Sequence, residues 1–180
     1  MKIVKNCLKH EFQLRTEVDY PVEGVEFIDI TPLILQKDVF EEIISSFTDV
    51  LKNQNIDYIV APEARGFLFG SSVSYSLGIP LIPVRKKGKL PPTAVEKTFS
   101  YEKEYGKDML ELPKLVQDSY KGKNFYLLDD IYATGNTLKA IGDAISSLGG
   151  KVIGSGVVLN ILELNDNQDL FSLIDVYESR

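Results

Sequence analysis

Two adjacent acids, followed by a run of small and hydroxyl-bearing residues, form the segment of this sequence best suited to chemistry. Asp129 and Asp130 come directly after the apolar stretch Phe125 to Leu128, which predicts a buried strand. The next residues, Ala133 to Thr137, lead straight into a predicted helix. In open α/β sheets, ligands bind at the carboxyl ends of parallel strands. We therefore expect this segment to bind a ligand.

The small residues after the acid pair are suited to holding a phosphate group. Their backbone N–H groups can converge on one anion, and the positive end of the helix dipole favours negative charge there. Thr134 and Thr137 add hydroxyl donors, and Gly135 permits a turn that a side chain would obstruct. The predicted phosphate ligands are Ala133, Thr134, Gly135, Asn136 and Thr137.

The acid pair needs a partner of its own, because two carboxylates beside a phosphate would repel it. Hydroxyl groups or a divalent cation on the ligand would satisfy Asp129 and Asp130. A ribose 5-phosphate carries hydroxyls and a phosphate at a suitable separation. The plainer alternative is a solvated strand end, with Thr134 acting only as a helix N-cap.

The elements around this segment repeat a pattern of helix followed by strand. Apolar residues at helical spacing predict helices over Phe40 to Leu51, Ala64 to Leu77 and Asn136 to Leu148. Short apolar runs predict buried strands over Ile56 to Val60, Ile79 to Val84, Asn124 to Leu128 and Lys151 to Leu159. This alternation predicts an α/β fold, with a mostly parallel sheet flanked by helices.

Three segments fall outside this repeat. Lys86 to Lys123 is long for a connection in a compact domain, so we expect a lid, with a disordered surface insertion as the alternative. Within it, Thr98 to Tyr101 and Asp108 to Leu112 can pair as a hairpin. Residues 1–35 lack a clear period and are expected to form a small hood over the sheet of a single domain spanning residues 1–180. Residues 165–180 carry no assigned role beyond a short strand near the end.

Composition narrows the class of protein. The chain is 44% hydrophobic and 26% charged, which is ordinary for a globular domain. It has no apolar stretch near the roughly 20 residues that a membrane helix needs, and no secretory signal, so we expect a cytoplasmic protein. A net charge of -6 argues against a nucleic-acid partner. The lone Cys7 and lone His10 make a poor metal site and are expected to be structural.

Several motifs along the chain occur in the order typical of one enzyme family. Besides the acid pair and its loop, they are Phe27 to Pro32, Glu63 to Gly70, Val84 to Pro91 and Glu104 to Lys107. Together they resemble the adenine phosphoribosyltransferase family, whose type I fold has an N-terminal hood and a flexible catalytic loop. The resemblance implies transfer of the phosphoribosyl group from phosphoribosyl pyrophosphate to adenine, giving AMP and pyrophosphate in purine salvage.

The resemblance also implies how the leaving pyrophosphate is held. Arg65 and Gly66 open a helix and are assigned to pyrophosphate, with Arg65 also catalytic. The basic residues Arg85, Lys86 and Lys89 are assigned to the same group, partly across a homodimer interface, although a solvated basic run is the alternative. Magnesium is implied as the cofactor, bound mainly through substrate oxygens, with Asp129 and Asp130 contributing through water at most. A cis peptide bond near Glu63 and Ala64 is implied as well.

The remaining assignments by resemblance concern the base. Glu104 is implied as an acid/base catalyst at the tip of the closing loop, beside the lid residue Tyr105. Phe27 is implied to stack on the purine, while backbone groups of Val25 and Ile28 read its edge. The alternatives are an exposed loop acid at Glu104 and a buried hood residue at Phe27.

Two positions depart from the family pattern. Ile28 stands where the family commonly has arginine, and Asn136 replaces the second glycine of the phosphate loop. The first departure leaves open a preference for hypoxanthine, guanine or xanthine in place of adenine. A noncatalytic sensor of phosphoribosyl pyrophosphate is a further alternative, but it would normally carry a DNA-binding extension. A purely structural role is disfavoured by the acid pair, the phosphate loop and the lid motif.

Overall fold

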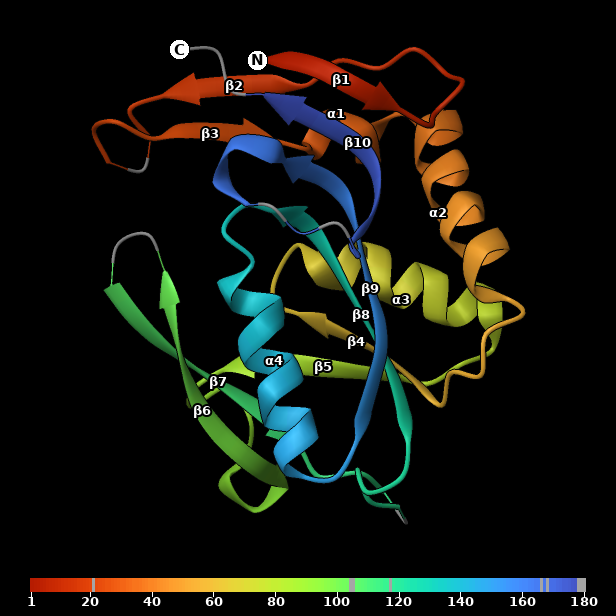
Figure 1. Cartoon of the computed structure of the whole chain (residues 1–180), viewed down its shortest axis with the longest axis vertical. Helices are drawn as coiled ribbons and strands as arrows, with labels where there is room; N and C mark the ends of the chain where they lie inside the picture. Colours follow the sequence, from red (N-terminus) through yellow and green to blue (C-terminus); the bar gives the residue numbers. More distant parts are fainter. Residues whose placement is uncertain (21, 104–105, 117, 166, 168, 178–180) are drawn as a thin grey trace.

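An eight-stranded sheet forms the centre of the molecule, in the order β1-β10-β9-β8-β4-β5-β7-β6 (Figure 1). The computed structural model describes residues 1–20, 22–103, 106–116, 118–165, 167 and 169–177. The parallel strands are β4 (Tyr58–Pro62), β5 (Leu81–Lys86), β8 (Asn124–Tyr132), β9 (Lys151–Ile161) and β10 (Phe171–Tyr177). The antiparallel edges are β1 (Lys2–Asn6) on one side and β7 (Gly106–Pro113) with β6 (Val95–Lys103) on the other. The predicted α/β fold with a mostly parallel sheet is confirmed.

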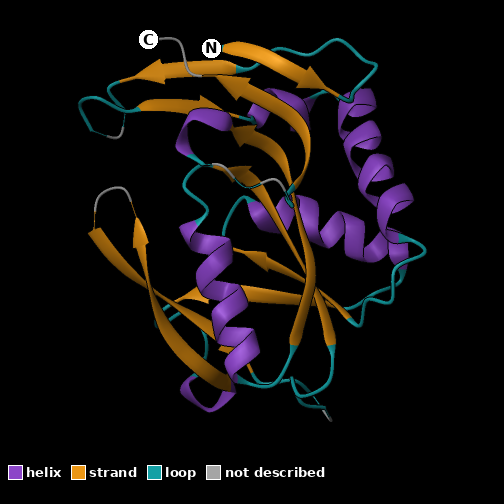
Figure 2. Cartoon of the chain, in the orientation of Figure 1, coloured by secondary structure: helices purple, strands orange, loops and turns teal. Residues whose placement is uncertain are grey.

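Helices cover both faces of this sheet (Figure 2). They are α2 (Lys37–Leu51) and α3 (Gly66–Leu77) on one face and α4 (Asn136–Ser147) on the other. Side chains alternate along each buried strand, so Tyr126 packs in the same core as Phe69 of α3, while its neighbour Leu127 packs with Ile141 of α4. Burial of both faces explains why the strands read as nearly continuous apolar runs.

The predicted helices and parallel strands are all present, but the strands extend further at their carboxyl ends. Strand β8 was predicted to stop at Leu128, and it continues to Tyr132. Its ladder with β9 runs through Asp129 opposite Val157 to Tyr132 opposite Asn160. The prediction was wrong because it used apolarity to end the strand, whereas backbone pairing with β9 does not depend on side-chain polarity.

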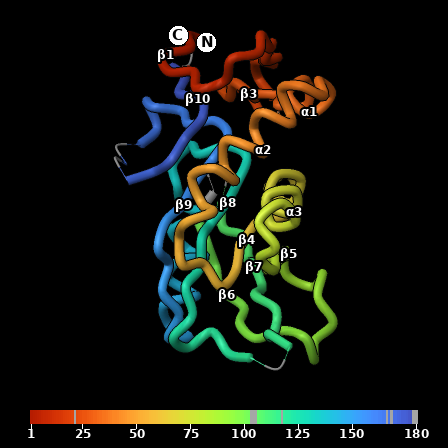
Figure 3. Tube along the Cα trace, turned by 90° about the vertical axis from the view of Figure 1, so that its right-hand side faces the viewer, coloured from red at the N-terminus to blue at the C-terminus, as the bar shows by residue number. Residues whose placement is uncertain are grey.

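The first 35 residues divide between two sheets. Strands β2 (Arg15–Val18) and β3 (Glu26–Asp29) form a separate antiparallel pair, followed by the short helix α1 (Thr31–Leu35). Strand β1 instead pairs with β10 at the edge of the central sheet. Figure 3 shows these N-terminal elements together at one end of the sheet, with β6 at the other. The separate β2–β3 pair, within residues 15–29, forms the hood beside the cavity.

The segment expected to be a lid adds strands to the sheet. After the short 3-10 helix η1 (Pro92–Ala94), β6 and β7 pair over most of their length, with Tyr101 opposite Asp108 as predicted for the hairpin. Strand β7 also pairs with β5 through Lys86 and Leu110. The hairpin therefore extends the sheet and points towards the hood (Figure 1). Glu104 and Tyr105 lie outside the described residues.

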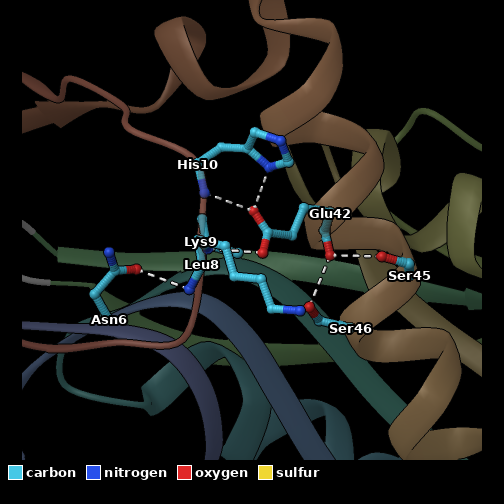
Figure 4. A network of polar contacts seen from close by, with 7 residues as sticks. All are labelled: Asn6, Leu8, Lys9, His10, Glu42, Ser45 and Ser46. Carbon is cyan, nitrogen blue, oxygen red and sulfur yellow. Dashed lines mark hydrogen bonds and ion pairs between the residues drawn. The ribbon is translucent and has the colours of Figure 1, made fainter.

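A carboxylate on α2 fastens the N-terminal segment to the body of the molecule (Figure 4). Glu42 accepts hydrogen bonds from the backbone N–H of Lys9 at 2.7 Å and of His10 at 3.0 Å, and it lies 2.8 Å from His10 Nδ1. The backbone N–H of Cys7 donates to Leu173 of β10 at 2.9 Å. Both Cys7 and His10 thus lie in a segment held by structural contacts.

Candidate active site

The acid pair lies on β8 just after the paired ladder between β8 and its neighbour β4 has ended. The last paired residues of these two strands are Val60 and Leu127, whereas β9 accompanies β8 as far as Tyr132. At Asp129 and Asp130 the β8 backbone is therefore no longer part of the ladder with β4. This geometry places the two acids at the carboxyl edge of the parallel sheet, where the sequence predicted a ligand site.

The two carboxyl groups are buried and electrostatically strained. Asp129 is 9% exposed and Asp130 5% exposed. The backbone N–H of Asp130 donates to Asp129 Oδ1 at 2.8 Å. Burial, and then the negative charge of Asp130, raise the pKa of Asp129 well above its usual range. A ligand that brings hydroxyl donors or positive charge to this pair would relieve that cost.

One cation, Arg65, spans the distance between the acids and the hood. Its Nε lies 2.6 Å from Asp130 Oδ2, an ion pair in which that oxygen still lacks a well-directed hydrogen bond from any described residue. The guanidinium carbon lies 5.3 Å from the centre of the Phe27 ring, within range of a cation–π contact. Its Nη1 reaches the carbonyl of Ile28 at 3.5 Å, a weak hydrogen bond. Arg65 thus connects the acid pair with the aromatic residue predicted to stack on the base.

The phosphate loop, Ala133 to Thr137, joins β8 to α4 as predicted. Gly135 has φ +78, a left-handed conformation that favours glycine, and helix α4 begins at the next residue. No side chain among the described residues caps this helix. The free N–H groups at the start of α4 are therefore available to an anion, together with the exposed hydroxyl of Thr134.

A second loop, between β4 and α3, approaches the acids closely. A side chain at Gly66 would place its Cβ only 2.7 Å from Asp129 Oδ1, so any other residue there would have to displace the Asp129 carboxyl group. The peptide bond between Glu63 and Ala64 is cis, as the resemblance implied. Glu63 accepts hydrogen bonds from Arg85 Nε and from the backbone N–H of Lys86, both at 2.6 Å. Burial raises the pKa of Glu63, but these hydrogen bonds outweigh it and the pKa lies below its ordinary value.

A cavity of about 880 Å³ brings most of the predicted site residues together. Those that line it are Val25, Phe27, Ile28, Arg65, Lys86, Asp129 and the whole phosphate loop. Asp130, Gly66, Arg85 and Lys89 are not among its lining residues. The side chain of Ile28 packs in the core at 3% exposure, so only its backbone is presented to the Arg65 side.

Sequence reasoning did not single out several residues that the cavity contains. Tyr101 and Glu102 reach it from β6, and Ile131 and Tyr132 follow the acid pair on β8. The position of Tyr132, between the acids and the phosphate loop, was a signal that could have identified it. The β6 residues gave no such signal, because only the folded hairpin brings them to the cavity.

Comparisons with known proteins agree with this geometry. The family profile for the phosphoribosyl transferase domain matches residues 33–171. A curated adenine phosphoribosyltransferase from Clostridium acetobutylicum is 44% identical over 151 residues, which cover 84% of this chain and 86% of the relative. The chain belongs to the adenine phosphoribosyltransferase family. The family predicted from the sequence motifs is therefore confirmed.

Solved structures of adenine phosphoribosyltransferases share the fold. The enzyme from Thermoanaerobacter pseudethanolicus superposes with a TM-score of 0.81 at 38% identity, covering 91% of this chain and 95% of that one. The enzyme from Saccharomyces cerevisiae, complexed with an imino-altritol bisphosphate and adenine, gives a TM-score of 0.76 at 34% identity, covering 89% and 93%. Because these relatives are adenine phosphoribosyltransferases, they support adenine, rather than hypoxanthine, guanine or xanthine, as the base.

Proposed function

We propose that this chain transfers the 5-phosphoribosyl group from phosphoribosyl pyrophosphate to adenine, giving AMP and pyrophosphate. The observation that carries the proposal is one cavity lined by a buried acid, a phosphate loop at a helix start and an aromatic residue of the hood. Those features match a nucleotide in three parts, namely ribose, phosphate and base. The adenine bound to the yeast relative supports the choice of base.

The phosphate loop binds the 5-phosphate in this proposal. Ala133, Thr134, Gly135, Asn136 and Thr137 all line the cavity, and the uncapped start of α4 adds a partial positive charge. The glycine that begins the turn is Gly135, so Asn136 does not have to adopt the left-handed conformation itself. The departure at Asn136 is thereby compatible with phosphate binding.

The acid pair holds the ribose hydroxyls. Asp129 and Asp130 present buried oxygens, one of which accepts no well-directed hydrogen bond from a described residue, so hydroxyl donors fit them. Their negative charge also favours the positive charge that develops on the ribose as pyrophosphate departs. Both acids act in the reaction through this electrostatic contribution.

The same donor set suits magnesium. The buried carboxylate oxygens of the acid pair are hard ligands and fit a hard dication, bound mainly through substrate oxygens and water. None of the described residues form a group of three or more side chains that would hold a metal alone. Asp129 and Asp130 would contribute through water. Magnesium, when bound, supplies positive charge to the pyrophosphate oxygens.

Pyrophosphate leaves on the side of the β4–α3 loop. Arg65 is near enough to exchange its contact with Asp130 for the phosphate oxygens, and Gly66 keeps the backbone close to the acids. Lys86 lines the cavity, while Arg85 is oriented by Glu63. Lys89 lies further along the same connection and completes the proposed basic group.

The hood binds the base, and the hairpin closes over it. Phe27 stacks on adenine, and backbone groups of Val25 and Ile28 read its edge, which fits an inward-packed Ile28 side chain. Glu104, which follows β6 in the sequence, acts as acid or base on the purine, and Tyr105 is the neighbouring residue assigned to the lid. Closure excludes water from the reacting ribose.

Two further properties are proposed from the family. A homodimer is supported by exposed apolar residues on α3, where Tyr75 is 91% exposed and Leu68 44% exposed. A cytoplasmic location is supported by Cys7, an exposed free thiol that suits a reducing compartment. None of the helices in the described part of the chain has the length and apolarity to span a bilayer.

The test is product formation from phosphoribosyl pyrophosphate and magnesium with adenine, hypoxanthine, guanine and xanthine supplied in parallel. Adenine should give AMP at a rate at least about tenfold above each other base, because a site that reads base hydrogen bonds discriminates by tenfold or more. A chelator should abolish the product. Preference for another base would overturn the specificity, and no product with any base would overturn the activity.

A further inference from the structure

The phosphate loop has little support of its own. At the end of the loop, the backbone N–H of Lys139 donates to the carbonyl of Gly135 at 3.0 Å, a bond that belongs to the start of helix α4. In the described residues, no side chain of the loop is hydrogen bonded to another part of the fold. A loop of this kind has to be shaped by neighbouring residues if it is to meet a phosphate with its N–H groups already aligned.

One such neighbour is Asn165, just after the 3-10 helix η2 (Leu162–Leu164). Its Nδ2 lies 3.0 Å from the carbonyl of Ala133, 2.9 Å from that of Ile161 and 2.9 Å from Asn160 Oδ1. The two carbonyls can only accept, so the amide orientation is fixed by its surroundings. Asn165 therefore ties the first residue of the phosphate loop to the end of β9.

A second contact extends this support. Asn165 Oδ1 accepts a hydrogen bond from the backbone N–H of Asn167 at 3.2 Å, and Asn167 Nδ2 donates to the Tyr132 hydroxyl at 3.1 Å. Asn167 Oδ1 in turn accepts from the N–H of Asp169 at 3.0 Å, which fixes the orientation of its amide. The chain of contacts leads from η2 to the residue that precedes the loop.

Tyr132 makes close contact with the turn of the loop. A Cβ at Gly135 would lie 2.1 Å from the Tyr132 hydroxyl oxygen and 2.3 Å from its ring carbon. The tyrosine thus occupies the space beside Gly135 that another residue's side chain would need. Glycine at position 135 thus allows both the left-handed turn and the close approach of the Tyr132 ring.

We propose that Asn165, Asn167 and Tyr132 are positioning residues for the 5-phosphate, which hold the phosphate loop in its binding shape before the ligand arrives. The inference rests on the proposed function, because it takes the 5-phosphate as the ligand of this loop. It gives a role to a segment whose sequence had indicated none. Loss of these hydrogen bonds would lower the affinity for ligands that carry a 5-phosphate. The affinity for pyrophosphate, which binds at Arg65 and Lys86 in this proposal, would be unchanged.

The test is calorimetric titration of the full chain with two ligands in separate experiments. One ligand is ribose 5-phosphate, and the other is pyrophosphate with magnesium. Asn165→Ala should weaken ribose 5-phosphate about tenfold, and the milder Tyr132→Phe about three- to fivefold, since each removes hydrogen bonds of ordinary strength. Pyrophosphate affinity should stay within about twofold in both. In turnover assays, KM for phosphoribosyl pyrophosphate should rise while KM for adenine does not.

Asn124→Ala is the matched control, because its Nδ2 donates to the carbonyl of Asn55 at 3.0 Å at the opposite end of β8. It should leave both affinities unchanged. Parental affinity for ribose 5-phosphate in Tyr132→Phe and Asn165→Ala, or equal loss for both ligands, would overturn the inference. If the parent chain binds pyrophosphate but not ribose 5-phosphate, the proposed function itself fails, and the inference with it.

Discussion

Two carboxylate sites in this molecule differ in the number of hydrogen-bond donors that surround them. One is Glu42 on α2, and the other is the pair Asp129 and Asp130 on β8. Glu42 meets two backbone N–H groups and the ring of His10 within 3.0 Å (Figure 4). The acid pair is more deeply buried, and the negative charges of its two members repel each other. Among the described residues, the cation that forms an ion pair with it is Arg65.

The pKa of Glu42 is lowered from its ordinary value, whereas the pKa of Asp129 is raised. Burial alone raises the pKa of Glu42, but hydrogen bonds from the backbone of His10 and Lys9 outweigh it, so its pKa lies below the ordinary 4.5. For Asp129, burial and the charge of Asp130 raise the pKa by more than the backbone N–H of Asp130 and the charge of Arg65 lower it. A carboxylate supplied with donors by its own fold stabilises the fold, whereas one left without them has capacity to bind a ligand.

The largest effect expected from this contrast is on turnover. Replacing both acids, Asp129→Asn with Asp130→Asn, should lower kcat by about 10²- to 10³-fold, because the charge that favours the developing ribose cation is lost. The circular dichroism spectrum and the cooperative melt should remain those of a folded protein. Steady-state assays with adenine measure the change. Turnover at the parental rate would remove the role assigned to the acids.

The opposite outcome is expected at Glu42. Glu42→Gln keeps the size of the side chain but places an NH₂ group where N–H donors converge, so it should cost about 1 kcal/mol of unfolding free energy. That corresponds to a melting temperature lower by about 2–4 °C. Turnover should stay within about twofold of the parent. A loss of turnover at unchanged stability would contradict the distinction between the two sites.

The smallest effect expected is a difference in pH dependence. The folded-state pKa of Asp129 is raised, so its contribution to stability falls as pH rises from the ordinary 3.8 through the folded value. Asp129→Asn removes this penalty, so the melting temperature of the variant minus that of the parent should be a few degrees larger at pH 8 than at pH 4.5. This corresponds to about 1 kcal/mol of unfolding free energy at most. Thermal melts at both pH values measure it.

Glu42 supplies the control for the sign of this effect. Its folded pKa is lowered, so its stabilisation is present above pH 4.5 and is lost as pH falls through the folded value. The difference in melting temperature between Glu42→Gln and the parent should therefore shrink towards low pH. If Asp129→Asn and Glu42→Gln showed the same pH trend, the electrostatic contrast would be wrong.

Much of the fold was predictable because its signals are local. Helical spacing predicted α2 and α3 to within a few residues. The apolar strand β8, its acid pair and the small residues that follow it indicated where the proposed phosphate loop lies. The end of β8 was not predictable in this way, because the pairing of Tyr132 with Asn160 joins residues from separate strands. The hairpin was foreseen, but its addition to β5 through Lys86 was not.

By itself, the sequence determined the order of helices and strands, the family and the position of the loop proposed to bind phosphate, because these depend on residue type and short spacing. Only the tertiary structure decided that β1 joins the central sheet, where Lys2 lies opposite Tyr177. It also decided that Arg65 contacts both Asp130 and Phe27, and that Asn165 supports Ala133. Such contacts join residues distant in the chain, and a residue's own neighbours in sequence carry no information about them.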